Sequence, residues 1–271
     1  PVDTQLRDQQ AGFRKDRWCT DQISTLRFIV EQSIEWNSPL YTNFLDYKNA
    51  FDGVDRRILW NLLRHYDAPE KIVNIIRNSY DGLHCKVVRR GQLTDTFEVK
   101  TGARQGCLLS PFSLLVIDWI MKTATSQDTL RIQSTTSMQL DDLDFANDLA
   151  LLSHTQLQMQ MKTNNIVADS EAVGLNIHQE KSKILRYKTT NTNLITLGGE
   201  ILEDVETFTY LGSIIDKQGG SDSEVRARMG KARAVFLQPK NIWNSNQLSV
   251  NIKVKFFNTN VKTVQLYGAK T

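Results

Sequence analysis

The sequence contains few of the residues that form disulfide frameworks or zinc sites. Its 271 residues include only three cysteines, Cys19, Cys85 and Cys107, which are widely spaced and form no CxxC pair. None of the four histidines stands at metal-ligand spacing beside them. An odd number of isolated cysteines argues against the disulfide scaffold of a small secreted protein, and we expect a reducing compartment.

Long hydrophobic runs and a signal peptide are also missing. The apolar segment LLVIDWIM is far shorter than the roughly 18 residues that a membrane-spanning helix needs. We therefore expect a soluble, intracellular protein without membrane contact. The chain opens at Pro1 without an initiator methionine and contains no repeat, low-complexity tract or long linker. We expect a fragment that folds as one continuous body.

Charge is distributed unevenly, although the net charge is only +3. Residues 216–271 contain ten lysines and arginines against three acidic residues, so residues 1–215 are mildly acidic. A basic end joined to a body with clustered aspartates fits a protein that holds nucleic acid with one part and metal ions with the other. The alternative is a solvated pair of basic helices.

Hydrophobic spacing predicts helices in several parts of the chain. Apolar residues recur at helical intervals in 23–34 and 58–64, and a polar-faced helix should run over 156–173 and stop at Gly174. Near the C-terminus, Ser221 and Glu224 have the spacing of a capping box, and Ser249 can cap a last helix. These spacings are typical of helix starts.

Short apolar runs bounded by turn residues predict strands between these helices. YTNFLDY should form a buried strand that ends at Asp46, and FTYLGSII should form another strand. HCKVVRR and DTFEVK predict a hairpin, and so do MQLDDLDF and LALLS, with acidic groups at the tip of the second one. Helices and strands together indicate an α+β fold.

Two aspartates stand where strands end. Asp46 follows the first buried strand, and Asp148 lies about 100 residues later in a predicted hairpin turn. Two carboxylates on separate rigid elements are what a two-Mg²⁺ phosphoryl-transfer site requires. Taken singly, each aspartate could equally only shape a turn or terminate a strand.

Six segments follow one another along the chain: QAGFRKDRWCTDQI near the N-terminus, then 43–55, 102–111, 143–152, 174–184 and 207–215. Together they resemble the ordered motifs of reverse transcriptases from non-LTR, LINE-type retrotransposons, with RTE-like elements as the most similar subgroup. The first resembles the fingers segment of that family, and the other five resemble, in this order, motif A, motif B, motif C, motif D and motif E. The resemblance implies a right-hand polymerase fold with part of the fingers and the palm in 1–215 and a helical, basic thumb start in 216–271.

The resemblance assigns the palm residues a role in nucleotidyl transfer. Asp46 and Asp148 would hold two Mg²⁺ ions, for which Mn²⁺ can substitute, and Lys181 would be a partner or proton donor for the departing pyrophosphate. Phe51 matches the steric gate that excludes a 2′-hydroxyl, so the product should be DNA. For Phe51 the alternative is core packing, and for Lys181 a solvated surface position.

Further segments would bind the nucleotide and the primer. Gln105 and Gly106 match the motif B pair that contacts the incoming nucleotide, where glycine allows close backbone approach. The primer grip would be formed by Tyr210, Leu211 and Gly212, which could also be a plain edge strand. In the thumb, three basic residues would contact duplex phosphates without reading sequence: Arg226, Lys231 and Arg233.

Position 147 departs from the family pattern. Motif C ends in two aspartates in this family, but here the first is Asn147. Its neutral amide replaces an anionic metal ligand, so we expect impaired catalysis. Asp142 and Asp144 are not expected to substitute, because they lie further back on the preceding strand. Lys48 and Gly53 also differ from the usual motif A residues.

The resemblance implies the core of an RNA-directed DNA polymerase, a nucleotidyltransferase for target-primed reverse transcription. Its partners would be an RNA template, a DNA primer or duplex and deoxynucleoside triphosphates. An endonuclease and an upstream fingers region with an Arg-Pro-Ile run would belong to a larger polyprotein that works in cytoplasmic ribonucleoprotein and in the nucleus. The alternatives are an inactive nucleic-acid-binding relic, an intron maturase or RNA-templated RNA polymerase, and a metal-dependent nuclease.

Overall fold

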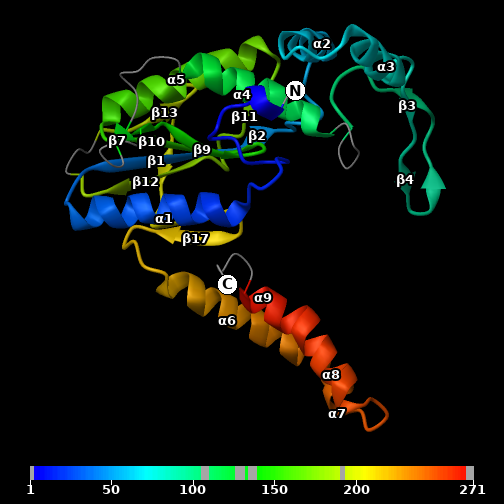
Figure 1. The fold of residues 1–271 in the computed structure, drawn as a ribbon, viewed down its shortest axis with the longest axis vertical. Coiled ribbons are helices and arrows are strands. Elements are labelled where there is room, and N and C mark those ends of the chain that lie inside the picture. Colours follow the sequence, from blue (N-terminus) through cyan, green and yellow to red (C-terminus); the bar gives the residue numbers. More distant parts are fainter. Residues whose placement is uncertain (1–2, 105–109, 126–131, 134–138, 190–192, 267–271) are drawn as a thin grey trace.

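A five-stranded sheet forms the centre of the protein, and helices cover both of its faces (Figure 1). The computed structural model describes residues 3–104, 110–125, 132–133, 139–189 and 193–266. The strand order is β15-β12-β1-β10-β9. The strands are antiparallel except for β15, which is parallel to β12. Their bounds are β1 Leu40–Leu45, β9 Asp142–Phe145, β10 Asp148–Ser153, β12 Lys183–Tyr187 and β15 Glu203–Asp204.

The central strand β1 is buried at all six positions, as the sequence predicts. On one face, α1 (Cys19–Glu35) packs Leu26 and Val30 against Phe44 of β1. On the other face lie α4 and α5, whose apolar residues join those of α2 and α3 in the larger core. Each fully buried Leu, Ile or Phe contributes about 1.5–3 kcal/mol, so the two-sided cover fixes the position of β1 and its end. Bounds are α2 Arg56–His65, α3 Glu70–Tyr80, α4 Ser113–Ala124 and α5 Gln156–Ala172.

The hairpin predicted around Asp148 is present. β9 and β10 pair from Phe145 opposite Asp148, with Ala146 and Asn147 as the two turn residues. Ala146 has a φ of 58°, the left-handed value that tight hairpin turns require. The helix α5 ends before Gly174, whose φ of 80° confirms the predicted stop.

Two details of the sequence prediction are wrong. FTYLGSII is a hairpin of two strands, β16 (Thr207–Tyr210) and β17 (Ser213–Asp216), because Leu211 and Gly212 both have positive φ and turn the chain. The helix α6 (Asp222–Leu237) does follow Ser221, but that side chain forms no capping hydrogen bond. Glu224 instead binds Ser213 of β17, Arg27 of α1 and Arg228, which attaches the start of α6 to β17 and α1.

The remaining elements are short. After α6 the chain returns beside it through α8, which Ser249 caps as predicted, and α9 (Figure 1). No helix in the described ranges is both long and apolar enough to span a bilayer. The remaining helices are η1 Asp3–Gln5, η2 Ser110–Phe112, α7 Lys240–Asn244, α8 Val250–Phe256, the π-helix Phe257–Lys262 and α9 Thr263–Leu266. The paired short strands are β2 Tyr47–Lys48 with β11 Asn176–Ile177, β3 His84–Cys85 with β6 Phe97–Glu98, β4 Val88–Arg89 with β5 Gln92–Leu93, β7 Ile132–Gln133 with β8 Gln139–Leu140, and β13 Thr196–Leu197 with β14 Glu200–Ile201.

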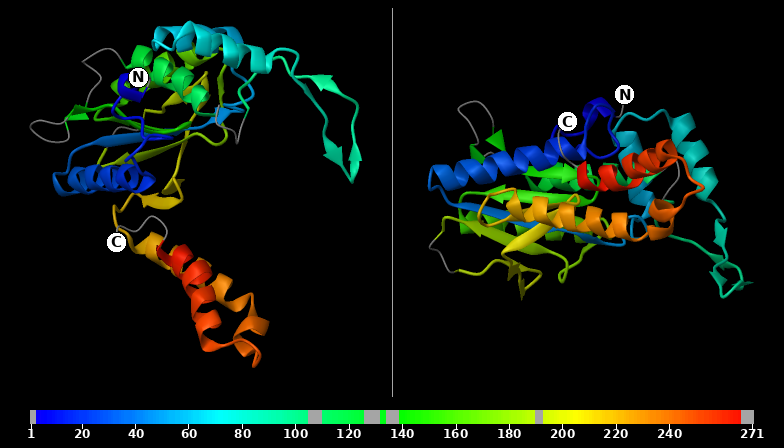
Figure 2. Two further views of the ribbon diagram at one scale, coloured as in Figure 1. Left: turned by 45° about the vertical axis from the view of Figure 1, so that its right-hand side comes forward. Right: turned by 90° about the horizontal axis from the view of Figure 1, so that it is seen from below.

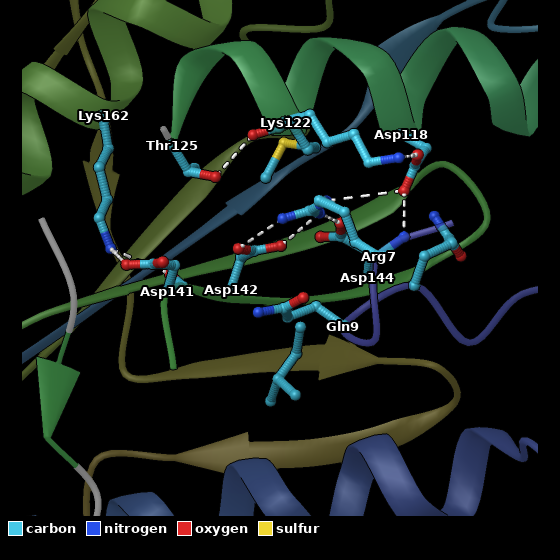
Figure 3. Close-up of polar contacts among 12 residues, drawn as sticks. Arg7, Gln9, Asp118, Lys122, Thr125, Asp141, Asp142, Asp144 and Lys162 are labelled. Carbon is cyan, nitrogen blue, oxygen red and sulfur yellow. Dashed lines mark hydrogen bonds and ion pairs between the residues drawn. The ribbon is translucent and has the colours of Figure 1, made fainter. Parts of the chain in front are cut away.

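A buried charge cluster joins the N-terminal segment to α4 and β9 (Figure 3). The Arg7 guanidinium binds Asp142 through two hydrogen bonds of 3.0 and 2.6 Å and also pairs with Asp144. Its backbone N–H donates to Asp118, whose other oxygen accepts from the Tyr66 hydroxyl at 2.6 Å. All three carboxylates have fully buried side chains. Burial and then the charge of Asp142 raise the pKa of Asp144 well above its usual value.

Replacing Arg7 should destabilise the fold strongly. Arg7→Met leaves three buried carboxylates without their main cation, and such a loss typically costs about 3–5 kcal/mol. Urea unfolding followed by circular dichroism measures this free energy. The matched control is Arg17→Met, because Arg17 pairs with the exposed Asp8 at 3.4 Å and should contribute less than about 1 kcal/mol. Equal effects of the two substitutions would contradict the structural role of Arg7.

Candidate functional site

Asp46 and Asp148 meet at one edge of the central sheet. Asp46 follows β1 directly, and Asp148 is the first residue of β10. Leu45 pairs with Leu149, so the next residues along this antiparallel ladder, Asp46 and Asp148, face each other across the two strands. Both line a cavity of about 450 Å³.

Two carboxylates, Asp46 and Asp148, and two lysines, Lys181 and Lys183, line the cavity, and Lys183 pairs with Glu203. Although Asp148 as a residue is exposed, the protein around its carboxyl group raises its pKa by desolvation, and the charge of Asp46 adds to this shift. The Lys181 ammonium lies 3.1 Å from Asp46, but its side chain is 63% exposed. An exposed pair of this kind contributes little stability, so a stronger cation can replace the ammonium.

Backbone pairing brings Lys181 to this edge. β11 pairs with β2, directly after Asp46, and the His178 N–H donates to the Asp46 carbonyl at 2.7 Å. The Ser182 hydroxyl accepts from the Asp46 N–H at 3.4 Å and donates to the His178 carbonyl at 2.8 Å. The segment that resembles motif D is therefore attached to the one that resembles motif A.

The β16–β17 hairpin forms another wall of the cavity. Tyr210 and Leu211 line it, and Gly212 follows in the turn. The Tyr210 hydroxyl donates to the Leu143 carbonyl at 3.0 Å, and its ring packs against Phe44 with 5.6 Å between centroids. Tyr210 is buried, so it anchors the hairpin and leaves Leu211 at the rim.

Phe51 lies in the loop after β2 and is half-buried. Its carbonyl accepts from the Ala103 N–H at 2.7 Å, so this loop is bound to the start of the segment that resembles motif B. Phe51 is not among the described residues that line the cavity of Asp46 and Asp148. Gln105 and Gly106 lie outside the described residues.

Asp142 and Asp144 cannot reach this cavity from β9. Side chains alternate between the two faces of a strand, and Phe145 is the residue opposite Asp148. Asp142 and Asp144 therefore project from the other face, where Arg7 binds both. Among the described residues, no group of three or more His, Cys, Asp or Glu is arranged to hold a metal ion.

The residues that hold the Ala146–Asn147 turn are not among those predicted from sequence patterns. Gln10 is fully buried, and its amide donates to the Ala146 carbonyl at 3.1 Å and accepts from the Ala146 N–H at 2.8 Å. It also accepts from the Gly12 N–H at 2.8 Å. A Cβ on Gly12 would overlap the backbone of Ala146. QAGFR is part of the segment that resembles the fingers motif. Within it, a Gln two positions before a Gly is the only sequence feature that could have indicated this close approach to the turn.

We expect substitution of Gln10 to loosen the hairpin turn of Ala146 and Asn147. Gln10→Leu leaves buried backbone groups of Ala146 and Gly12 unpaired, and each such group costs about 1–3 kcal/mol. Hydrogen exchange at the Ala146 amide, followed by NMR, should accelerate, and the free energy of unfolding should fall. Gln247→Leu on the exposed surface is the control and should change neither quantity.

Gly12→Ala tests the same contact from the other side. Its control is Gly230→Ala in α6, where an added Cβ meets no atom within 4 Å and should be neutral or slightly stabilising. If Gly12→Ala were as well tolerated as Gly230→Ala, the close packing of Gly12 on the turn would be wrong.

Comparisons with known proteins identify the family of the chain. The family model described as "Reverse transcriptase (RNA-dependent DNA polymerase)" matches residues 1–215, and one for a domain of unknown function matches residues 235–267. The Pol polyprotein of the retrotransposable element R2DM from Drosophila melanogaster is 26% identical over 174 residues, which are 64% of this chain and 16% of that protein. The R2 polyprotein from Nasonia vitripennis is 26% identical over 231 residues, which are 79% of this chain and 22% of that protein. The chain thus spans less than a quarter of either relative.

The fold itself is similar to that of telomerase. An apo telomerase from Candida tropicalis without its C-terminal domain superimposes with a TM-score of 0.55 at 16% identity, over 80% of this chain and 42% of that one. Telomerase of the same organism in complex with telomeric RNA gives a TM-score of 0.54 at 13% identity, over 92% and 41%. These neighbours confirm the predicted right-hand polymerase fold. The chain belongs to the reverse transcriptase (RNA-dependent DNA polymerase) family, and its relatives are Pol polyproteins of non-LTR retrotransposons.

Proposed function

We propose that the chain is the RNA-directed DNA polymerase core of a non-LTR retrotransposon polyprotein and acts in target-primed reverse transcription. The observation that carries this proposal is the meeting of Asp46 and Asp148 in a cavity that the β16–β17 hairpin also lines. Its substrates are an RNA template, a DNA primer and deoxynucleoside triphosphates. The RTE-like subgroup, the division into 1–215 and 216–271 and the cytoplasmic and nuclear localisation are parts of the same proposal.

The residues at this edge fit a divalent cation. Family members use divalent metal ions, and desolvation, with the nearby charge of Asp46, raises the pKa of Asp148. Two Mg²⁺ ions, or Mn²⁺, would supply activation of the primer 3′-hydroxyl and neutralisation of phosphate charge. Asp46 and Asp148 would hold them. The Lys181 ammonium, no longer paired with Asp46, would then bind the departing pyrophosphate and donate its proton.

The neighbouring segments would position the substrates. The Tyr210 anchor presents Leu211 and Gly212 to the primer end, as in a primer grip. Phe51 would stand beside the sugar of the incoming nucleotide and exclude a 2′-hydroxyl, so that DNA is made. Gln105 and Gly106 would contact the same nucleotide. The attachment of the Phe51 loop to Ala103 supports a shared nucleotide site for these segments.

Asn147 should impair the reaction. It occupies the second position of a two-residue turn directly before Asp148, so its side chain is a near neighbour of the proposed metal ligands. A neutral amide oxygen binds Mg²⁺ less strongly than a carboxylate. With Asp142 and Asp144 on the other face, no described aspartate of this hairpin compensates for the missing charge.

Replacement of Asn147 by aspartate tests whether Asn147 impairs the reaction. Asn147→Asp should increase primer extension on an RNA template with Mg²⁺ by at least on the order of 10–100-fold, the loss typical of altered groups around a catalytic metal. Asp46→Asn in the reverted chain is the control and should abolish extension. Equal extension by the unreverted and reverted chains would show that Asn147 does not limit catalysis.

The second candidate function is nucleic-acid binding without turnover, and Asn147 is the observation that favours it. Binding would rely on α6, where Arg226, Lys231 and Arg233 are all exposed. Arg226 and Arg233 are two helical turns apart and share a face, whereas Lys231 lies about 140° around the helix from Arg226. Two of the three predicted contacts can therefore follow one phosphate backbone.

Charge reversal on α6 tests this binding surface. The double variant Arg226→Glu with Arg233→Glu should weaken duplex binding and lower the slope of log K against log salt by about two, one for each phosphate contact. Lys231→Glu should have the smaller effect. Titration of a labelled RNA–DNA duplex at several salt concentrations measures both quantities. An unchanged slope in the double variant would remove α6 from the interface.

A further inference from the structure

A basic hairpin projects from the body between α3 and the segment that resembles motif B (Figure 2). β3 pairs with β6 at its base and β4 with β5 at its tip. Every residue from Lys86 to Glu98 is exposed. A lone two-stranded ribbon is at best marginally stable in water, so a hairpin of this length gains order from a partner.

The charge of the hairpin indicates an anionic partner. Residues 84–104 contain five lysines and arginines against two acidic residues, and no acidic residue occurs between His84 and Leu93. Arg90 and Gly91 have φ values of 50° and 79°, which is the pattern of a type I′ turn. This turn fixes Arg89 and Arg90 at the tip, with Lys86 on the strand leading to it.

A cleft of about 580 Å³ lies at the base of the hairpin. Phe97, which is 48% exposed, lines this cleft together with Asp52, Gly102 and Ala103. Ala103 is the residue that binds the Phe51 carbonyl. The cleft therefore borders the loop at which the incoming nucleotide is proposed to bind.

Arg56 makes the base of the hairpin rigid. Its guanidinium donates to the carbonyls of Val99, Thr101 and Gly102 at 2.7 to 3.0 Å. It also lies 4.7 Å from the centre of the Tyr80 ring. One cation at the start of α2 thus attaches the segment that leaves the hairpin to the body.

We propose that the hairpin and its cleft bind the unpaired template strand as it approaches the nucleotide site. Phosphates of the strand would contact Lys86, Arg89 and Arg90, and a base would stack on Phe97. Basic groups along a path with an exposed aromatic ring are the usual means of holding single-stranded nucleic acid. The inference rests on the proposed polymerase function and adds a contact outside the catalytic cavity.

The test compares two labelled primer–template duplexes by fluorescence anisotropy. One is blunt, and the other carries a 5′ RNA template overhang of about eight nucleotides. The unsubstituted chain should bind the overhang duplex at least fivefold more tightly. Arg89→Glu with Arg90→Glu, and separately Phe97→Ala, should reduce that ratio toward one and leave the affinity for the blunt duplex unchanged. All three positions are exposed, and thermal unfolding verifies that each variant folds.

Lys71→Glu with Arg77→Glu, two exposed positions on α3, is the matched control and should keep the overhang preference. Tight binding of both duplexes with an unchanged ratio in the hairpin variants overturns the inference but not the proposed function. Failure of the unsubstituted chain to bind either duplex overturns both. A hairpin substitution that instead dissociates a dimer in gel filtration, with the ratio unchanged, assigns the hairpin to a second copy of the chain and also overturns the inference.

Discussion

The ion pairs of Arg7 are the constraint on which the sheet edge with Asp46 and Asp148 depends. One guanidinium joins the N-terminal segment to β9 and, with its backbone N–H, to α4. Because β9 pairs with β10, the same cluster also fixes the strand that begins with Asp148. Buried ion pairs of this kind need not add stability over apolar packing, but removal of one partner is costly. The segment before α1 is therefore attached to the central sheet and to α4 by buried ion pairs.

The hairpin of β9 and β10 separates two kinds of carboxylate. On one face, Asp142 and Asp144 are buried and share the positive charge of Arg7. On the other face, Asp148 meets Asp46, whose described ion-pair partner is the exposed Lys181. The first set is held by a buried cation, whereas the second set is the one to which we assign the proposed divalent ions. Strand alternation alone produces this division, since neighbouring residues of one strand point to opposite faces.

Local patterns were sufficient for the parts of the site that one strand or one turn determines. The burial of β1, the end of that strand at Asp46 and the turn before Asp148 all follow from short apolar runs and turn residues. Contacts between distant segments could not be predicted from these patterns. Gln10 and Ala146, for example, are 136 positions apart, and no periodicity links them. Glu224 was misassigned for a related reason. A capping box is a local option, and the ion pairs with Arg27 and Arg228 compete with it through tertiary packing.

The substitution at position 147 changes the charge of the turn without removing its support. Gln10 holds the turn through the backbone N–H and carbonyl of Ala146, and Gly12 packs against the same backbone. None of these contacts uses the side chain of residue 147, so an asparagine and an aspartate can occupy the same turn geometry. An aspartate there would add a charge next to Asp148, whose pKa is already raised by desolvation and by the charge of Asp46. We therefore expect the asparagine to lessen charge repulsion at this turn and, in the proposed metal site, to weaken the attraction for the divalent ions.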